Sequence, residues 1–348
     1  MTSVVDAPDV ASKVGHYYRV EDVYEVGREK VREYARAVQD FHPAHWDEDA
    51  ATALGYSGLV APLTFVSIPA MAANRTLFES VVVGYDMFVQ TEQVFEQHKP
   101  IVAGDRLVVD VELSSVRRIA GKDLITVTNT FADESGETVH IMHTTVVGIT
   151  GDDGIDPEIT RAVENVMVHG VKVFGGRDAE DAPAEAGELP RRPEGEIQLS
   201  VEGAARVPGT TLSFDELTVG DELPLRDARV SRGDLVNYAG VSGDGNPIHW
   251  DESIAKLADL PDIIAHGMLT MGLGAGFLST WSGDPGAVTR YGVRLSAPTV
   301  VGRTGGQVEY TGRVKSLDPE TRTAVIAIVA KSGGRKIFGL ATANLRFR

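Results

Sequence analysis

The chain has 348 residues, a formal net charge of −17 and no cysteine. The length predicts two domains, each with enough residues for a core, and the composition, 43% hydrophobic and 24% charged, is typical of a globular protein. The absence of cysteine excludes disulfides, thiolate nucleophiles and zinc–thiolate sites. The negative charge argues against nucleic acid and anionic membranes as partners. Without a long apolar run or a signal pattern, the expected location is cytoplasmic and no membrane insertion is expected.

Residues 1–150 are expected to form the first domain, behind a loose N-terminal tail. A short amphipathic helix is predicted from Val31 to Val38, and an apolar helix from Leu59 toward Met71. Alternating apolar runs separated by turn signals then predict four strands. These strands are expected at 87–96, 106–117, 124–132 and 138–149.

Residues 151–208 are expected to be a linker between two domains. From Gly175 to Gly195 the sequence is rich in Asp, Glu, Ala, Pro and Gly and has almost no apolar residue. Such a composition cannot bury enough apolar surface to order itself, so an extended tether is predicted. Within the linker, residues 158–173 could form a short helix or an extra strand.

Residues 209–348 are expected to form the second domain. Ser231 lies three residues before Asp234, which is the spacing of a capping box at a helix start. A buried helix rich in small residues is predicted from Ile263 to Trp281, with Gly267 near its first turn. Strands are expected at 289–295, 305–315, 323–331 and 336–347, with a hairpin turn at 332–335.

The two domains are internal repeats of each other. At an offset of 204 residues, Asp40 matches Asp244, and residues 45–48 (His-Trp-Asp-Glu) match residues 249–252. The chain is therefore expected to be a duplicated domain. It should form a pseudo-twofold pair with its sheets joined edge to edge, so that one chain does what a dimer would.

Acid–base chemistry is predicted at Asp244 and His249 of the second copy. Asn246 and Pro247 lie between them, and Asn-Pro favours a turn because proline fixes φ and disfavours the α region in the preceding residue. A turn can bring both side chains to one point, whereas a helix would separate them. A carboxylate beside an imidazole can move protons near neutral pH. The alternative is a structural Asp/His pair in an ordinary turn. Asn246 is expected mainly to fix that turn, and it is also a candidate for binding the substrate.

The start of the predicted central helix is the second candidate feature. Gly267 lets a ligand approach the backbone, and the free N–H groups at a helix start suit a developing oxyanion. His266 precedes it and could bind substrate or simply cap the helix. The glycines at 272, 274 and 276 could serve helix–sheet packing.

The motif D-x-N-P-I-H-x-D at 244–251, followed by I-x-H-G-M at 264–268, resembles the signature of the MaoC-like dehydratases, the (R)-specific enoyl-thioester hydratases called hydratase 2. The resemblance implies an α+β double hotdog, with antiparallel sheet wrapped around central helices. It implies that Asp244 and His249 act on a water or hydroxyl at C3 and a proton at C2 of an acyl thioester. Backbone N–H groups near Gly267 would polarise the thioester carbonyl. No metal or other cofactor is implied.

The two copies differ at the helix start. Residues 62–64 (Pro-Leu-Thr) replace residues 266–268 (His-Gly-Met), so a proline removes an amide donor and a leucine replaces the glycine. The segments 29–35, 59–65 and 99–105 resemble the non-catalytic HadA-type subunit of the actinobacterial (3R)-hydroxyacyl-ACP dehydratase of mycolic acid elongation. The second copy resembles its catalytic HadB-type partner. Asp40 and His45 nevertheless persist, and we expect them to be vestigial or structural; the alternative is that both copies are active.

Together these features predict a (3R)-3-hydroxyacyl-thioester dehydratase, or (R)-specific 2-enoyl-thioester hydratase, of fatty acid elongation. The first copy would be a degenerate hotdog that binds the acyl chain. The expected partner is an acyl-ACP or acyl-CoA substrate, and a homodimer is possible. The alternatives are a hotdog acyl thioesterase and a non-catalytic acyl-thioester-binding protein. An acidic carrier would need a local basic patch, for which the arginines at 290, 294, 303 and 313 are candidates.

Overall fold

The computed structural model describes residues 10–85, 87–149, 157–166 and 206–348. Most of the expected linker lies outside these ranges, so the extended tether stays a prediction. The part of residues 158–173 that is described lies in helix α4 (Pro157–Val166), and the helical alternative is the one observed there. No helix within the described ranges is both long and apolar enough to cross a membrane.

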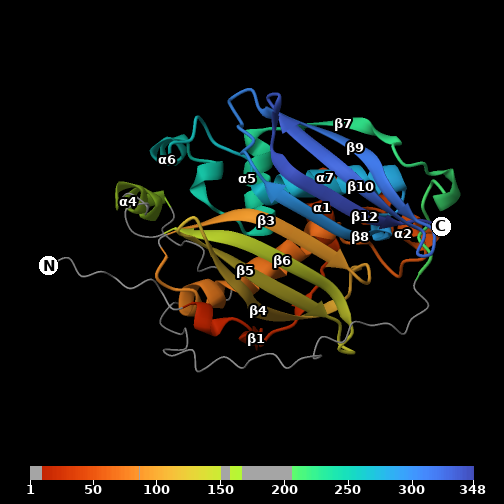
Figure 1. The fold of residues 1–348 in the computed structure, drawn as a ribbon, viewed down its shortest axis with the longest axis horizontal. Helices are drawn as coiled ribbons and strands as arrows, with labels where there is room; N and C mark the ends of the chain where they lie inside the picture. The colour runs from red at the N-terminus through yellow and green to blue at the C-terminus, as the bar shows by residue number, and fades with distance from the viewer. Residues whose placement is uncertain (1–9, 86, 150–156, 167–205) are drawn as a thin grey trace.

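The first half places three α-helices beside a curved antiparallel sheet (Figure 1). Its elements are β1 (Tyr17–Arg19), β2 (Tyr24–Glu25), α1 (Arg28–Ala37), α2 (Glu48–Ala53), α3 (Ser67–Thr76), β3 (Met87–Gln97), β4 (Arg106–Ile119), β5 (Lys122–Ala132) and β6 (Thr138–Ile149). The predicted apolar helix begins later than expected. A 3-10 turn, Leu63–Val66, precedes α3, so the start of this helix differs from that of its counterpart in the second half.

The second half repeats this plan with a longer central helix. Its elements are β7 (Glu222–Val230), α5 (Arg232–Ser242), α6 (Glu252–Leu257), α7 (Gly267–Ser282), β8 (Val288–Leu295), β9 (Gly306–Asp318), β10 (Thr323–Ser332), β11 (Arg335–Lys336) and β12 (Phe338–Arg346). The capping box predicted at Ser231 and Asp234 is present at the start of α5.

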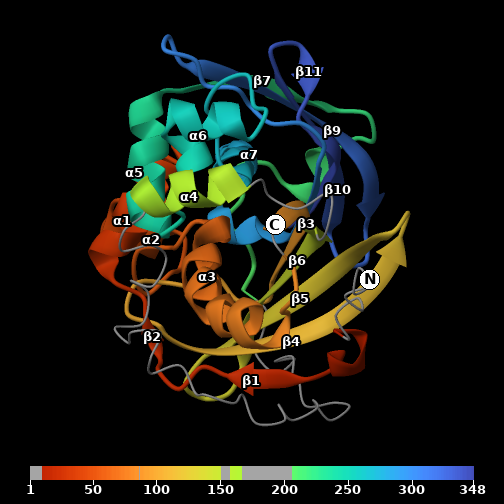
Figure 2. The same ribbon diagram turned by 90° about the vertical axis from the view of Figure 1, so that its left-hand side faces the viewer.

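One continuous antiparallel sheet joins the halves, as the duplication predicts. The strand order is β1-β4-β5-β6-β3-β8-β12-β10-β9-β7, and β3 pairs with β8 from Glu92 opposite Arg294 to Glu96 opposite Arg290. The helices lie together on the inner side of this sheet (Figure 2). Each half thus has the hotdog arrangement of helices covered by curved sheet, and the expected α+β double hotdog is confirmed.

Helix α7 is buried along almost its whole length, and its glycines allow close packing. A Cβ at Gly272 would lie 2.5 Å from Cγ1 of Val38, and a Cβ at Gly274 would meet the hydroxyl of Tyr291. Larger side chains would force these neighbours apart. The expected helix–sheet packing is present at Gly274, which faces Tyr291 of β8, whereas Gly272 packs against Val38 at the end of α1.

A buried carboxylate fastens the two halves at the end of α7. Asp284 is fully buried and accepts hydrogen bonds from Tyr56 of the first half and from Arg206. The backbone N–H groups of Gly209 (2.7 Å) and Gly286 (2.9 Å) complete its surroundings. Because every partner donates, the charge of the buried carboxylate is compensated.

Candidate active site

The predicted turn between Asp244 and His249 is present. Helix α5 ends at Gly243, whose φ of 85° lies in the left-handed region and turns the chain away from the helix axis. A 3-10 turn, Pro247–His249, then carries the histidine back, and Asn246 caps it by accepting a hydrogen bond from the N–H of Ile248 (3.2 Å). Asn246 therefore stabilises the turn that carries His249.

Three ionisable side chains meet at this turn. Asp244, His249 and His266 each place one nitrogen or carboxylate oxygen within 4.8 Å of the others. His249 is 6% exposed and His266 is 1% exposed, whereas Asp244 is only half-buried. The carboxylate therefore lies on the wetter side of the cluster and the two imidazoles on the drier side.

The tautomer of His249 follows from its one strong hydrogen bond. Its Nδ1 lies 2.8 Å from the carbonyl oxygen of Ile264, which can only accept, so Nδ1 carries the proton. Burial lowers the pKa of His249, although the charge of Asp244 opposes this effect. A neutral ring at pH 7 leaves Nε2 with a free lone pair that can take a proton.

His266 has a different environment from the one expected. It stands at the N-cap position of α7, but its side chain makes no capping bond. Its Nε2 donates to the backbone carbonyl of Asp244 (3.1 Å), and its ring stacks on that of His249. Burial and the neighbouring His249 lower its pKa to about 4. This geometry fits support of the dyad better than contact with substrate, and the predicted substrate-binding role stays untested.

Gly267 is the first residue of α7 and is half-buried. Among the described residues, none accepts a hydrogen bond from its N–H. A Cβ at this position would lie 2.8 Å from Cδ1 of Leu295 and 3.7 Å from Oε1 of Gln90. The helix start is therefore narrow, and only glycine fits without displacing Leu295.

Gln90 is a residue near the site that sequence reasoning missed. It lies on β3 of the first half, and its Nε2 donates to Oε1 of Gln93 (2.8 Å). The first half therefore contributes a polar side chain to the surroundings of Gly267. The available signal was the edge-to-edge pairing of the duplicated sheets, which places β3 next to the second half.

By distance alone, Asp244, His249 and His266 could hold a metal ion. The two imidazole rings, however, are stacked with centroids 3.7 Å apart and planes at 29°. An imidazole binds a metal in the plane of its own ring, and two nearly parallel planes do not converge on one ion. The arrangement suits proton transfer better than metal coordination.

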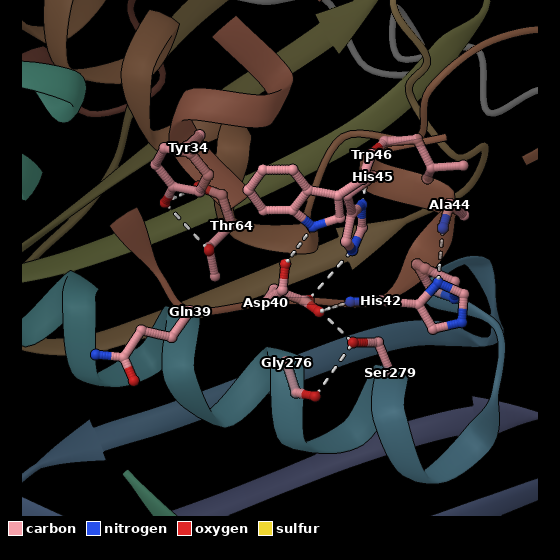
Figure 3. Close-up of polar contacts among 12 residues, drawn as sticks. Tyr34, Gln39, Asp40, His42, Ala44, His45, Trp46, Thr64, Gly276 and Ser279 are labelled. Carbon is pink, nitrogen blue, oxygen red and sulfur yellow. Dashed lines mark hydrogen bonds and ion pairs between the residues drawn. The ribbon is translucent and has the colours of Figure 1, made fainter. Parts of the chain in front are cut away.

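The first half retains a similar dyad (Figure 3). His45 Nδ1 lies 2.6 Å from the carbonyl oxygen of Val60, just as His249 bonds to Ile264. His45 Nε2 lies 3.2 Å from Oδ2 of Asp40, close enough for an ion pair but without good hydrogen-bond geometry. The duplication has thus preserved the local fold of the dyad.

The surroundings of this first dyad are closed. Asp40 is 2% exposed and His45 is completely buried. Ser279 of α7 donates to Asp40 (2.9 Å), as Figure 3 shows, and a Cβ at Gly276 would lie 3.1 Å from Cγ of Asp40. Burial raises the pKa of Asp40, but His45 and these donors outweigh it and bring the pKa to about 2. Helix α7 of the second half therefore packs directly against the dyad of the first half.

Comparison with known proteins divides the chain in the same way. Residues 12–142 match the family profile of the FAS1-like dehydratase domain region, and residues 214–330 match that of the MaoC-like domain. One match falls in each half of the duplicated sheet. Fold and matches together define a two-domain dehydratase of the double hotdog type.

Similar proteins give the family. A solved MaoC-like dehydratase is 62% identical, with a TM-score of 0.89, over 97% of this chain and 100% of that one. A UPF0336 protein of Mycobacterium tuberculosis is 43% identical over 146 residues, which are 41% of this chain and 92% of the relative. A conserved hypothetical protein of the same species, described as a double hotdog fold, is 15% identical with a TM-score of 0.60 and covers 96% of each chain, which bears on the fold alone.

The chain therefore belongs to the MaoC-like dehydratase family, and the expected resemblance is confirmed. Membership supports a hydro-lyase activity in general terms.

Proposed function

We propose that the second half hydrates 2-enoyl thioesters to (3R)-3-hydroxyacyl thioesters and catalyses the reverse dehydration in fatty acid elongation. One observation carries the proposal. His249 is held neutral with a free Nε2 beside the carboxylate of Asp244, next to the open N–H of Gly267. A base, a second proton-transfer group and an oxyanion donor are the parts that this reaction needs.

In dehydration, one member of the dyad would take the proton from C2. A proton would then pass to the hydroxyl that leaves C3 as water. As C2 loses its proton, the thioester oxygen gains enolate character, and the N–H of Gly267 would hold it. Asp244 is more exposed than His249 and so is better placed to meet the water.

The first half is proposed to be inactive and to bind the acyl chain, in a fusion of HadA-type and HadB-type units. The closed surroundings of Asp40 and His45 support inactivity, because Ser279 and Gly276 of α7 occupy that site. The first half also lacks the glycine start, having Pro62 and Leu63 before a 3-10 turn. An acyl-binding role rests on the resemblance alone.

Hydration of crotonyl-CoA tests the proposal directly. The wild type is compared with Asp244→Asn, His249→Ala and His45→Ala, and loss of the enoyl thioester is followed together with release of free thiol. We expect the two substitutions in the second half to lower kcat by about 10²–10⁴-fold, the usual contribution of a general acid or base. His45→Ala should leave the rate per folded molecule within about twofold, because its site is closed.

Other outcomes would point to the alternatives. Thiol release without hydration would indicate a thioesterase. Tight binding of the thioester without turnover, unchanged in Asp244→Asn, would indicate an acyl-binding protein. Equal losses for His249→Ala and His45→Ala, with both variants folded, would show that both halves are active and would overturn the proposed division of labour.

A further inference from the structure

We propose that an acidic acyl carrier protein docks on one end of the sheet, against two basic hairpin turns. The first is residues 117–122 between β4 and β5, and the second is residues 331–336 between β10 and β11. Each turn contains three cations and no acid, in a chain whose net charge is −17. The inference rests on the proposed function, because it names the carrier that delivers the thioester.

Strand directions place both turns at the same end of the sheet. The first residue of β3, Met87, pairs with Ile149 at the end of β6. The neighbouring residue of β6, Gly148, pairs with Asp123 at the start of β5. The turn between β4 and β5 therefore lies at the end of the sheet where β3 begins. In the second half, β8 ends opposite the start of β12, next to the turn at 331–336. Figure 2 looks onto this end, with β11 at the top.

The start of the catalytic helix lies at this end as well. A Cβ on Gly267 would contact Leu295, the last residue of β8, and would lie near Gln90 at the beginning of β3. The other end of α7 contacts Thr211 and lies beside the start of β8. A thioester that reaches Gly267 from the nearer end of the sheet would therefore pass the two turns.

Four cations of the two turns are available for a partner. Arg117, Lys331, Arg335 and Lys336 are exposed and form no ion pair with any residue that the structure describes. Ile119, at the tip of the first turn, is 51% exposed and adds an apolar contact. Arg118 is also exposed and donates only to the carbonyl oxygen of Gly121, within its own turn.

The arginines first considered for this role are engaged elsewhere. Arg290 and Arg294 pair with Glu96 and Glu92 across the β3–β8 junction. The other two, Arg303 and Arg313, also have glutamate partners. Their charge is offset locally by these glutamates, which makes them weaker candidates for docking than Arg117, Lys331, Arg335 and Lys336.

The opposite end of the sheet has mixed charge. The turn between β5 and β6 carries Asp133, Glu134 and Glu137, but Lys99 and Arg106 pair with these acids. The turn between β9 and β10 carries Asp318 and Glu320 together with Arg322. An acidic partner is therefore attracted more strongly to the end that holds the start of α7, and such a difference in charge steers association.

The separation of the turns favours a protein over a small molecule. Between β5 and β10 lie five strand spacings, in the order β5-β6-β3-β8-β12-β10. At about 4.8 Å each they span roughly 24 Å along the curved sheet. This width approaches the roughly 30 Å diameter of a small domain. A single cluster of phosphates could contact one turn but not both.

Charge reversal with a matched control tests the docking surface. The variants are Arg117→Glu and Lys336→Glu, singly and together, and the control is Lys315→Glu, an exposed lysine on β9 nearer the opposite end. The crotonyl group is supplied on an acidic holo acyl carrier protein, on coenzyme A and on pantetheine. We expect the double variant to lose about tenfold or more in kcat/KM with the carrier protein, an effect that added salt reduces. It should change less than about twofold with pantetheine, and the control less than about twofold with every substrate.

Two results would overturn the inference. Unchanged kcat/KM with the carrier protein would show that the turns do not dock it. Equal losses with coenzyme A and with the carrier protein would assign the turns to coenzyme A phosphates instead. Binding of the holo carrier protein to His249→Ala, measured by fluorescence anisotropy, separates docking from chemistry. Failure of the wild type to hydrate the crotonyl group on all three carriers would reject the proposed function, and the binding measurement would still decide the docking surface.

Discussion

His266 and His249 lie with their rings stacked, 3.7 Å between centroids and 29° between planes. The ring of Tyr238 lies on His266 as well, 4.8 Å away. Because His266 also donates to the carbonyl of Asp244, one side chain contacts both the backbone of Asp244 and the ring of His249. It directly precedes Gly267, so it ties the dyad to the helix start that would bind the thioester oxygen.

Substitution of His266 is expected to separate its two contacts. His266→Phe keeps a ring against His249 but loses the bond to Asp244, so kcat should fall by about tenfold or more because the acid is misplaced. His266→Gln can still donate to Asp244 but admits water to His249. Because water around His249 favours its charged form, this variant should raise the apparent pKa on the acid side of the kcat/KM profile. Identical pH profiles for both variants and the wild type would refute this positioning role.

Gly267→Ala is expected to lower activity while the fold survives. The added Cβ meets the far end of Leu295, a flexible side chain that can move by a few tenths of an ångström. The methyl group would stand beside the N–H proposed to bind the thioester oxygen. Removing one such donor typically costs about 10²–10³ in kcat, and a partial block should cost about tenfold or more.

Gly267→Ala combined with Leu295→Ala is the control for crowding. If displaced Leu295 is the only problem, the double variant should recover activity relative to the single one. If the methyl group blocks the oxyanion position, activity should stay low. Melting temperatures within a few degrees of the wild type would confirm that both proteins are folded, and full activity of the single variant would exclude Gly267 from the site.

In the pH profile of kcat/KM for hydration, activity should fall on the acid side with an apparent pKa below the ordinary histidine value of about 6.5. Burial lowers the pKa of His249 and Asp244 raises it, with burial the larger effect. Asp244→Asn removes the opposing charge, so the pKa of His249 should fall further. An NMR titration of the histidine ring carbons can follow this change without turnover. A rise in the pKa of His249 in this variant would contradict the assigned contact.

Sequence reasoning identified the duplication, the edge-to-edge sheets and the turn at Asn246 because each depends on local pattern or on alignment of the two halves. The β3–β8 junction followed from symmetry. The sequence did not predict the surroundings of each dyad, because these depend on side chains that the other half contributes. Gln90 reaches Gly267, and Ser279 reaches Asp40, across more than one hundred residues of sequence.

The contacts of His266 were also not predicted from the sequence. Its place before a helix suggested a cap or a substrate contact, both of which are local interpretations. Its observed partners, Asp244 and His249, arise from a loop that returns to the helix start. Spacing along the chain does not reveal which way a side chain turns at a helix N-terminus.

The dyad of the first half is expected to contribute stability instead of catalysis. Removing His45 leaves the charge of Asp40 buried and only partly compensated by Ser279 and the N–H of His42. Breaking a buried pair typically costs about 3–5 kcal/mol. His45→Ala should therefore melt well below the wild type, while His249→Ala, its matched counterpart, should melt close to it.

The pH dependence of that difference identifies its cause. The pKa of Asp40 is lowered to about 2 in the folded protein. Its contribution to the free energy of unfolding is therefore present above the pKa of about 4 that it has in the unfolded chain, and is lost as the pH falls toward 2. Burial lowers the pKa of His45, but Asp40 outweighs burial and raises it. The contribution of His45 to stability is therefore fully present below a pH of about 6.5 and is lost as the pH rises through the pKa of His45 in the folded protein. The gap in melting temperature between wild type and His45→Ala should be widest between pH of about 4 and 6.5. A gap independent of pH would indicate lost packing instead of a lost ion pair.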